Sequence, residues 1–169
     1  MKDYLINSYK FNLQYANELV KDVDNRLMAV SPGPGFENHP AFTIGHLVSG
    51  SAMMAEELGG PYEFNPEWEE LFRRNGPGDP RTPAEDSNLY PHKDDLLSAL
   101  TKQHNIVEDL ILNFDIDRFQ DPVEWRFEIH LPTLGDLLYF MCITHEAMHL
   151  SQLAAWRRAM GMPSAFARL

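Results

Sequence analysis

The sequence is short of cysteine, of basic clusters and of long hydrophobic runs. Its one cysteine, Cys142, excludes an internal disulfide and is typical of a reducing cytoplasm. Lys and Arg number 14 against 25 Asp and Glu, and no basic cluster exceeds the pairs Arg73-Arg74 and Arg157-Arg158, which argues against nucleic-acid binding. Wholly apolar runs are far shorter than the roughly 20 residues that span a bilayer. The N-terminal MKDYLINSYK also lacks the apolar block of a signal peptide. We therefore expect a cytoplasmic protein without a membrane or nucleic-acid partner.

Hydrophobic periodicity predicts an all-α protein. The expected long helices cover residues 3–30, 40–58, 93–114 and 133–160. The connection at 59–91 is rich in Gly, Pro and acidic residues, and it carries a short helix at 67–74. It is either a pocket wall or a simple crossover. Residues 124–131 alternate between apolar and polar, which predicts an extended segment. A chain of 169 residues suits one domain. We expect residues 1–169 to form an antiparallel four-helix bundle with a long connection between helices 2 and 3.

The last helix carries the best indication of function. Thr133 and Asp136 form a variant of the capping box at its start, and Gly161 and Pro163 end it. Residues four apart lie on one helical face. The expected face consists of Leu138, Cys142, His145, His149, Gln152 and Trp156. Two histidines thus lie one turn apart within an apolar stripe, with Cβ atoms roughly 5–6 Å apart.

His145 and His149 are close enough to chelate one cation, but a pair packed at the edge of a core would look the same. With Glu146 they form a formal HExxH, the motif of zinc peptidases. Such enzymes take a third ligand from downstream, and residues 150–169 contain no His, Asp, Glu or Cys. A di-iron bundle needs two Glu-x-x-His motifs, and only Glu146 to His149 fits. Any third ligand must therefore come from earlier in the chain.

His46 is the best candidate for that ligand. It lies on the inward side of the second helix, with Phe42, Gly50 and Met53. A lone histidine there is commonly structural, but a chelating pair elsewhere raises its importance. Glu57 lies about 16 Å further along the same helix, too far to bind the same ion. His104 lies at the margin of the third helix's apolar stripe, where it could support a ligand or be one.

Two segments resemble a known family. The matching stretches are Asn38–Leu47, with the sequence NHPAFTIGHL, and Thr144–Leu153, with the sequence THEAMHLSQL, followed by Arg157-Arg158 and Gly161-Met162-Pro163. They resemble the DinB-like superfamily of metalloproteins, which is unrelated to the DNA polymerase of that name. Ser151 stands where a glycine is common in that family.

The resemblance implies a four-helix bundle, often dimeric, with a divalent metal held by His46, His145 and His149. We therefore expect a homodimer. Family members with assigned chemistry include transferases and isomerases that use low-molecular-weight thiols. The resemblance thus favours a small-molecule substrate, with a low-molecular-weight thiol as a further partner.

Three neutral imidazoles would leave a zinc or nickel ion with open positions. Such an ion lowers the pKa of a bound water or thiol, or polarises a carbonyl. Thiol-dependent S-transfer or isomerisation is the expected reaction, metal-dependent hydrolysis is the alternative, and a non-catalytic metal- or ligand-binding bundle is a third possibility. Glu146 is the candidate catalytic residue, as a base or as an orienting group; it could equally be a solvated residue beside the stripe. Cys142 is expected in the core.

Overall fold

The computed structural model describes residues 2–76 and 79–169, and within them the fold is entirely helical. The long helices are α1 (Lys2–Val20), α2 (Pro40–Glu57) and α4 (Lys93–Asn113). The last long segment consists of α5 (Leu134–Tyr139), a π-helical turn (Phe140–His145) and α6 (Glu146–Ala159). A short α3 covers Glu69–Phe72, and 3₁₀ turns cover Asn25–Leu27, Pro66–Trp68, Ser87–Leu89, Ile116–Gln120 and Ala165–Arg168. The all-α prediction is confirmed.

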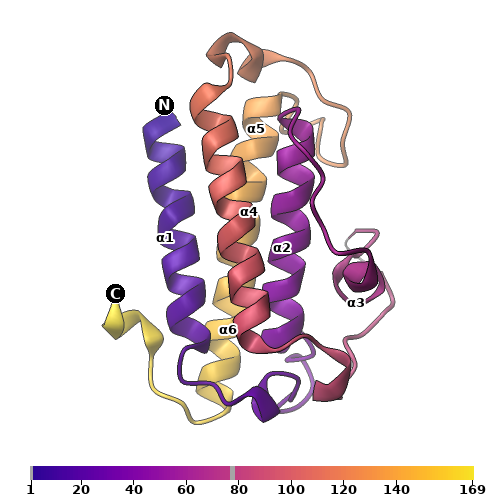
Figure 1. Ribbon diagram of the computed structural model, residues 1–169, viewed down its shortest axis with the longest axis vertical. Helices are drawn as coiled ribbons and strands as arrows, with labels where there is room; N and C mark the ends of the chain where they lie inside the picture. Colours follow the sequence, from indigo (N-terminus) through magenta and orange to yellow (C-terminus); the bar gives the residue numbers. More distant parts are fainter. Residues whose placement is uncertain (1, 77–78) are drawn as a thin grey trace.

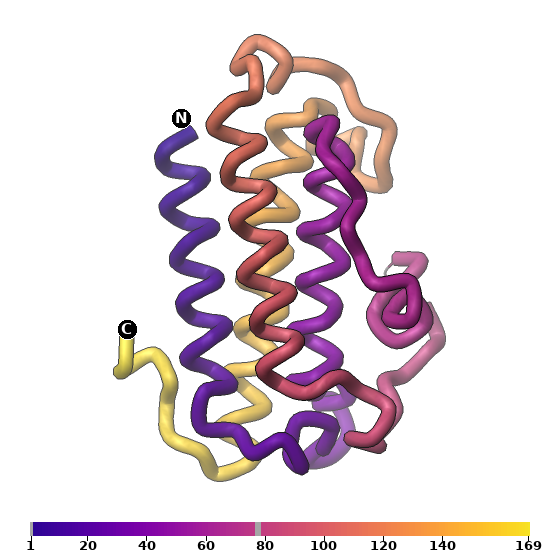
Figure 2. The backbone as a smooth tube through the Cα atoms, viewed as in Figure 1, coloured from indigo at the N-terminus to yellow at the C-terminus, as the bar shows by residue number. Residues whose placement is uncertain are grey.

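The long segments lie side by side as a helical bundle (Figures 1 and 2). α1 and the α5–α6 segment run in one direction, while α2 and α4 run in the other. α4 packs on both α1 and α2, and α6 also packs on both. α1 thus runs antiparallel to α4, and α2 antiparallel to α6, whereas α2 with α4 and α1 with α6 are parallel neighbours. Because α2 and α4 start at the same end, their connection must return along the length of the bundle, and it passes beside α2 with α3 (Figure 1).

The first helix ends ten residues earlier than the predicted 3–30. The Asp24 side chain accepts a hydrogen bond from the backbone N–H of Arg26 at 2.9 Å and starts a 3₁₀ turn there. Asp residues compete with helix in this way, because their side chains satisfy nearby backbone donors. Val23 and Met28 are still buried, which explains why the apolar periodicity continues past the helix end.

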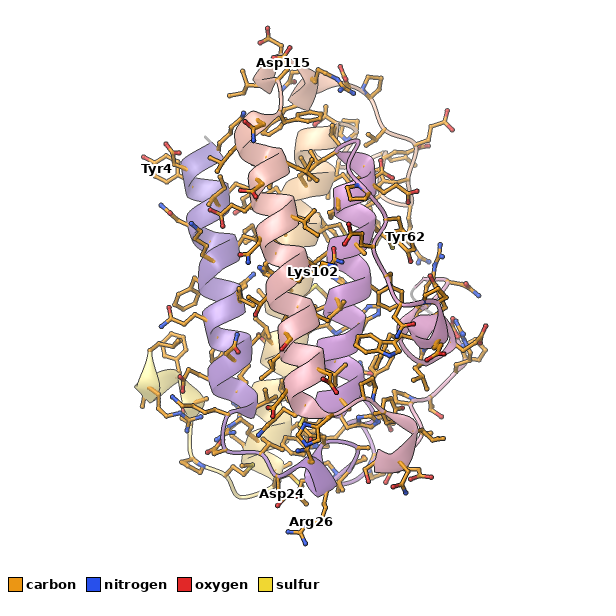
Figure 3. The ribbon with its side chains drawn as sticks, in the orientation of Figure 1. Tyr4, Asp24, Arg26, Tyr62, Lys102 and Asp115 are labelled. Atoms are coloured by element: carbon orange, nitrogen blue, oxygen red, sulfur yellow. The ribbon has the colours of Figure 1, made fainter. Side chains whose placement is uncertain are left out.

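Asp24, Arg26, Lys102 and Asp115 are exposed on the outside of the bundle (Figure 3). Inside, two clusters of buried apolar residues occupy successive levels. One contains Leu19, Ile44, Leu100, Leu150 and Trp156, and the other contains Ile6, Met54, Val107, Leu138 and Cys142. Buried polar residues come between the two clusters along three of the long segments. They are Asn12 on α1, His104 on α4 and Glu146 at the start of α6.

The extended segment predicted for residues 124–131 is wrong. The backbone N–H groups of His130 and Leu131 donate to the carbonyl of Phe127, at 2.9 Å and 2.8 Å, and so form tight turns. A strand needs a neighbouring strand to satisfy its backbone groups, and the described residues offer only an isolated bridge between Pro122 and Thr133. The aromatic residues of the segment pack instead on one another and on Phe140.

Residues 134–159 form a capped helical segment, as expected. Thr133 and Asp136 make both hydrogen bonds of the capping box, which confirms that prediction. Across the ranges 2–76 and 79–169, we find no helix with the length and apolar character needed to cross a membrane.

Candidate metal site

His46, His145 and His149 meet in space, as the sequence predicts. Their nearest ring nitrogens all lie within 4.8 Å of one another. The ring centroids of His46 lie 5.3 Å from those of His145 and 4.8 Å from those of His149. The Nε2 atoms of His145 and His149 are 3.1 Å apart. α2 thus supplies one imidazole and the junction of the π-helical turn with α6 supplies two.

His46 is oriented by the connection that returns beside α2. Its Nδ1–H donates to the backbone carbonyl of Phe72 at 2.8 Å, and a carbonyl can only accept. The remaining nitrogen, Nε2, therefore carries the lone pair in the neutral ring. Phe72 can come so close because Gly45 has no side chain: a Cβ there would lie 2.3 Å from the Phe72 ring.

His149 is oriented from its own helix. Its Nδ1 lies 3.1 Å from Oε1 of Gln152, and the same oxygen accepts a hydrogen bond from Nδ2 of Asn38, also at 3.1 Å. This places a hydrogen on Nδ1 of His149 and the lone pair on Nε2. Outer hydrogen bonds of this kind fix the tautomer and rotation of histidines that bind metals.

The electrostatics of the cluster favour neutral imidazoles. Burial, followed by repulsion from His46 and His145 when these are protonated, lowers the pKa of His149 to about 3. Burial followed by the charge of His46 lowers the pKa of His145 to about 4. Burial also lowers the pKa of His46. All three rings are therefore in the form that binds a metal at neutral pH.

The donor set fits a divalent ion. Two nitrogens bound to one tetrahedral zinc at about 2.0–2.1 Å lie about 3.3 Å apart. His145 and His149 are already near that separation, and His46 needs only a small shift toward them. Without an ion, the contact of 3.1 Å between the two Nε2 atoms requires a hydrogen on one of them, and a bound cation would take the place of that hydrogen. The three histidines could hold a metal ion.

The three histidines lie at one side of a cleft of about 460 Å³. Its lining includes Phe42, Met53 and Met141 as apolar residues, and Asn38, Arg74 and Gln152 as polar ones. An ion held by three imidazoles would therefore have space beside it for a small molecule. The connection predicted as a pocket wall or a crossover is both, because its residues Arg73, Arg74, Gly76, Asp79 and Arg81 line this cleft.

The predicted helix face needs one correction. Leu138, Cys142 and Trp156 are buried in the core, while His145 and His149 are only partly buried and Gln152 is exposed. The residue of the motif that belongs to the core face is Glu146, which is 3% exposed. Its interpretation as a solvated residue is therefore wrong.

Glu146 makes its hydrogen bond in the interior of the bundle, outside the histidine cluster. Its Oε1 lies 2.9 Å from Nε2 of His104, which is also buried. Burial raises the pKa of Glu146, although His104 opposes this. The gap lined by His145 and Glu146 is too narrow for a water molecule, and Glu146 is not among the described residues that line the metal-site cleft. His104 is thus the partner of Glu146 and lies away from the histidine cluster.

A buried polar network surrounds this pair. The Tyr9 ring stacks on His104 with centroids 3.7 Å apart, and its hydroxyl donates to Ser51 Oγ at 2.9 Å. Asn12 donates to the backbone carbonyls of Cys142 and Ile143 within the π-helical turn, at 3.2 Å and 3.3 Å. Cys142 is buried as expected, and burial raises the pKa of its thiol. The network holds the turn from which His145 projects.

Sequence reasoning missed the contributions of Phe72 and Arg74. The partner of His46 is a backbone carbonyl, which no residue pattern encodes, although the apolar Trp68 and Phe72 indicate that this segment packs against the bundle. Arg74 had appeared only as part of a short basic pair.

Together, the fold and the site define a helical-bundle protein whose three clustered histidines could bind a metal ion. The sequence matches the DinB superfamily over residues 9–153, and the chain belongs to that superfamily, which includes metal-binding proteins. The matched range contains all three histidines and Gln152. The family prediction is thus confirmed. A comparison with curated proteins finds no match.

Proposed function

We propose that the protein is a divalent-metal-dependent enzyme in which His46, His145 and His149 hold one zinc or nickel ion. The reaction that we propose is thiol-dependent S-transfer or isomerisation on a small molecule. The observation that carries the proposal is the set of three neutral imidazoles beside an open cleft. The thiol dependence rests on the family resemblance.

The residues of the chain have distinct tasks in this proposal. A bound ion would lower the pKa of a thiol or water, or polarise a carbonyl. Phe72 and Gln152 hold the imidazoles in the tautomer that can bind. Phe42, Met53 and Met141 provide apolar surface for the substrate and exclude water around it. Glu146 enters the proposal as a positioning residue, because its carboxylate contacts His104 and lies away from the cleft.

An open site argues for a catalytic ion in preference to a structural one. Structural zinc sites usually have four protein ligands. Among the described residues, only these three form a cluster that could hold a metal. Two sizeable apolar clusters also give the bundle a core that does not depend on an ion.

The test combines elemental analysis with an activity screen. Protein purified without chelators should contain one divalent ion per chain, and His46→Ala should lack it. Zinc-loaded, nickel-loaded and chelator-treated samples are then tested for transfer of low-molecular-weight thiols to small electrophiles, and for ester hydrolysis. Metal-dependent thiol transfer supports the proposal, metal-dependent hydrolysis alone would replace it, and metal binding without any turnover would favour a binding protein. Protein that stays metal-free after incubation with zinc or nickel would contradict it.

The proposed homodimer and cytoplasmic location belong to the same hypothesis. Trp68 and Trp125, the large aromatic residues that could contribute to a dimer contact, are half-buried against aromatic residues of their own chain. The dimer therefore rests mainly on the family resemblance. Light scattering at high protein concentration would decide it, since a monomer there contradicts the proposal.

A further inference from the structure

The cleft beside the histidines is cationic in a protein whose net charge is −11. Arg73, Arg74 and Arg81 line it, and Asp79 is the one carboxylate among the described lining residues. This local excess of positive charge is suited to binding an anion.

Two of the three arginines are already paired with carboxylates. Arg81 donates to Asp79 through Nε and Nη2, the latter at 2.6 Å, and Arg73 lies 3.4 Å from Glu69. Asp79 is further engaged by the backbone N–H groups of Asn75 and Arg81. The charges of these groups are therefore largely balanced within the protein.

Arg74 is different. It is partly buried, and within the described part of the chain its guanidinium has no carboxylate partner. Its Nη1 donates to the backbone carbonyls of Leu71 and Arg73, at 3.2 Å and 3.0 Å. Its Nε and Nη2 have no acceptor among those residues, so one edge of the planar guanidinium is available. Such an edge matches the two oxygens of a carboxylate.

The position of Arg74 connects it to the histidines. Its guanidinium carbon lies 4.4 Å from the centre of the Phe42 ring, and the Phe42 ring stacks on His46 with centroids 5.5 Å apart. Phe42 thus contacts both the guanidinium and the imidazole. A molecule that reaches from the histidines across Phe42 would bring its far end to Arg74.

We infer that the substrate of this centre carries a carboxylate, which Arg74 binds through its unpaired edge while the opposite end of the molecule lies at the three histidines. One unbalanced cation suits a singly charged carboxylate better than a phosphate dianion. The inference rests on the proposed metal function and specifies its substrate class. The substrates are small carboxylic acids long enough to reach from the histidines across the Phe42 ring to Arg74.

The test uses matched probes on zinc-loaded protein. 6-Mercaptohexanoate and 6-mercaptohexanol have the same thiol and the same number of carbons, but one ends in a carboxylate and the other in a neutral hydroxymethyl group; calorimetry gives their affinities. We expect the acid to bind about 10–100-fold more tightly than the alcohol. Arg74→Gln should remove this preference, and Arg74→Lys should restore only part of it, because an ammonium has no planar fork. Arg73→Gln is the matched control and should keep the preference, since Arg73 is paired with Glu69.

The outcomes separate this inference from the metal proposal. Equal binding of both thiols, a preference that survives Arg74→Gln, or no binding of either probe would overturn the carboxylate inference. Tighter binding of hexyl phosphate than of hexanoate would replace the carboxylate by a phosphate. Hexanoate binding to chelator-treated protein, weakened by Arg74→Gln, would support the anion site even if the metal proposal failed. A failure to load zinc contradicts the metal proposal alone.

Discussion

His145 and Glu146 are consecutive residues, yet they belong to two different polar clusters. The cluster around His145 contains three imidazoles whose nearest ring nitrogens lie within 4.8 Å of one another, beside an open cleft. The cluster around Glu146 is closed, and its members, His104, Tyr9 and Ser51, interact with one another in the interior. An open cluster of imidazole nitrogens is suited to binding an ion, whereas a closed cluster of buried, hydrogen-bonded and stacked side chains stabilises one arrangement of the core. Within the HExxH pattern, His145 and His149 therefore belong to the open cluster, while Glu146 belongs to a buried structural cluster.

The largest difference between the clusters should appear in metal binding. His145→Ala or His149→Ala removes one of three candidate ligands, and we expect metal affinity to fall by more than about 100-fold, beyond the effect of an outer-shell change. Glu146→Gln is the control and should keep affinity within about 10-fold, because Glu146 faces the closed cluster. Competition with a chromophoric chelator measures both. If Glu146→Gln lost the metal as completely as His145→Ala, the division into two clusters would be mistaken.

For stability, substitutions in the closed cluster around Glu146 should have the larger effect. His104→Ala leaves the buried Glu146 carboxyl without its hydrogen-bond partner, and a buried polar group left unpaired costs about 1–3 kcal/mol. Replacing both, as His104→Leu with Glu146→Leu, should recover much of this loss, since apolar side chains need no partners. Denaturant unfolding in the presence of chelator gives the free energies. A single substitution that costs less than about 1 kcal/mol would show that the pair contributes little.

Within the open cluster, the outer hydrogen bond to His149 should matter less than the ligand itself. Gln152→Ala removes the acceptor for Nδ1–H, and we expect a loss of about 10–100-fold in metal affinity. Asn38→Ala, which removes only the group that holds Gln152, should have a smaller effect. Both variants should melt like the wild type in chelator, because Gln152 is exposed. Unchanged affinity in Gln152→Ala would mean that the imidazole needs no such support.

The smallest effect concerns pH. The folded-state pKa of His149 is lowered to about 3, from about 6.5 in the unfolded chain. Between about pH 6.5 and pH 3, His149 is therefore protonated in the unfolded state but not in the folded state, so stability falls as the pH falls. Between pH 7 and pH 5, in chelator, wild type should lose on the order of 1 kcal/mol more than His149→Ala. Equal losses would mean that His149 titrates normally in the fold. From residue types alone, metal affinity should fall as the pH drops through about 6.5, the ordinary pKa of histidine. The lowered pKa values of these histidines move that fall to a lower pH.

Much of the fold could be predicted from the sequence because its long helices have clear caps and apolar periodicity. The ends of α2 follow from Pro40 and Gly59, and the capping box at Thr133 follows from residue types and spacing. The end of α1 could not be predicted, because Asp24 stops the helix while Val23 and Met28 continue its buried pattern. The conformation of residues 124–131 could not be predicted from alternation alone, because the pattern does not reveal whether a partner strand exists.

The site was predictable in its ligands and less so in its surroundings. Histidines at i and i+4, with a third inward histidine on another helix, are a pattern of residue types. The orientation of His46 depends on the Phe72 carbonyl, whose position follows from the return path of the connection. The burial of Glu146 depends on the exact rotation of α6, which an ideal helical wheel assigns to the wrong side.

That rotation has a local origin in the π-helical turn at Phe140–His145. Such a turn amounts to one residue inserted into an α-helix, which rotates everything after it by about 100° relative to everything before it. The segment thus behaves as two helices on one axis with different phases, joined where Asn12 holds the carbonyls of Cys142 and Ile143. Deleting a single residue from the turn would bring both halves into one phase and carry His145 and His149 away from His46. His145 and His149 would still be four residues apart in the sequence, but they would no longer lie beside His46.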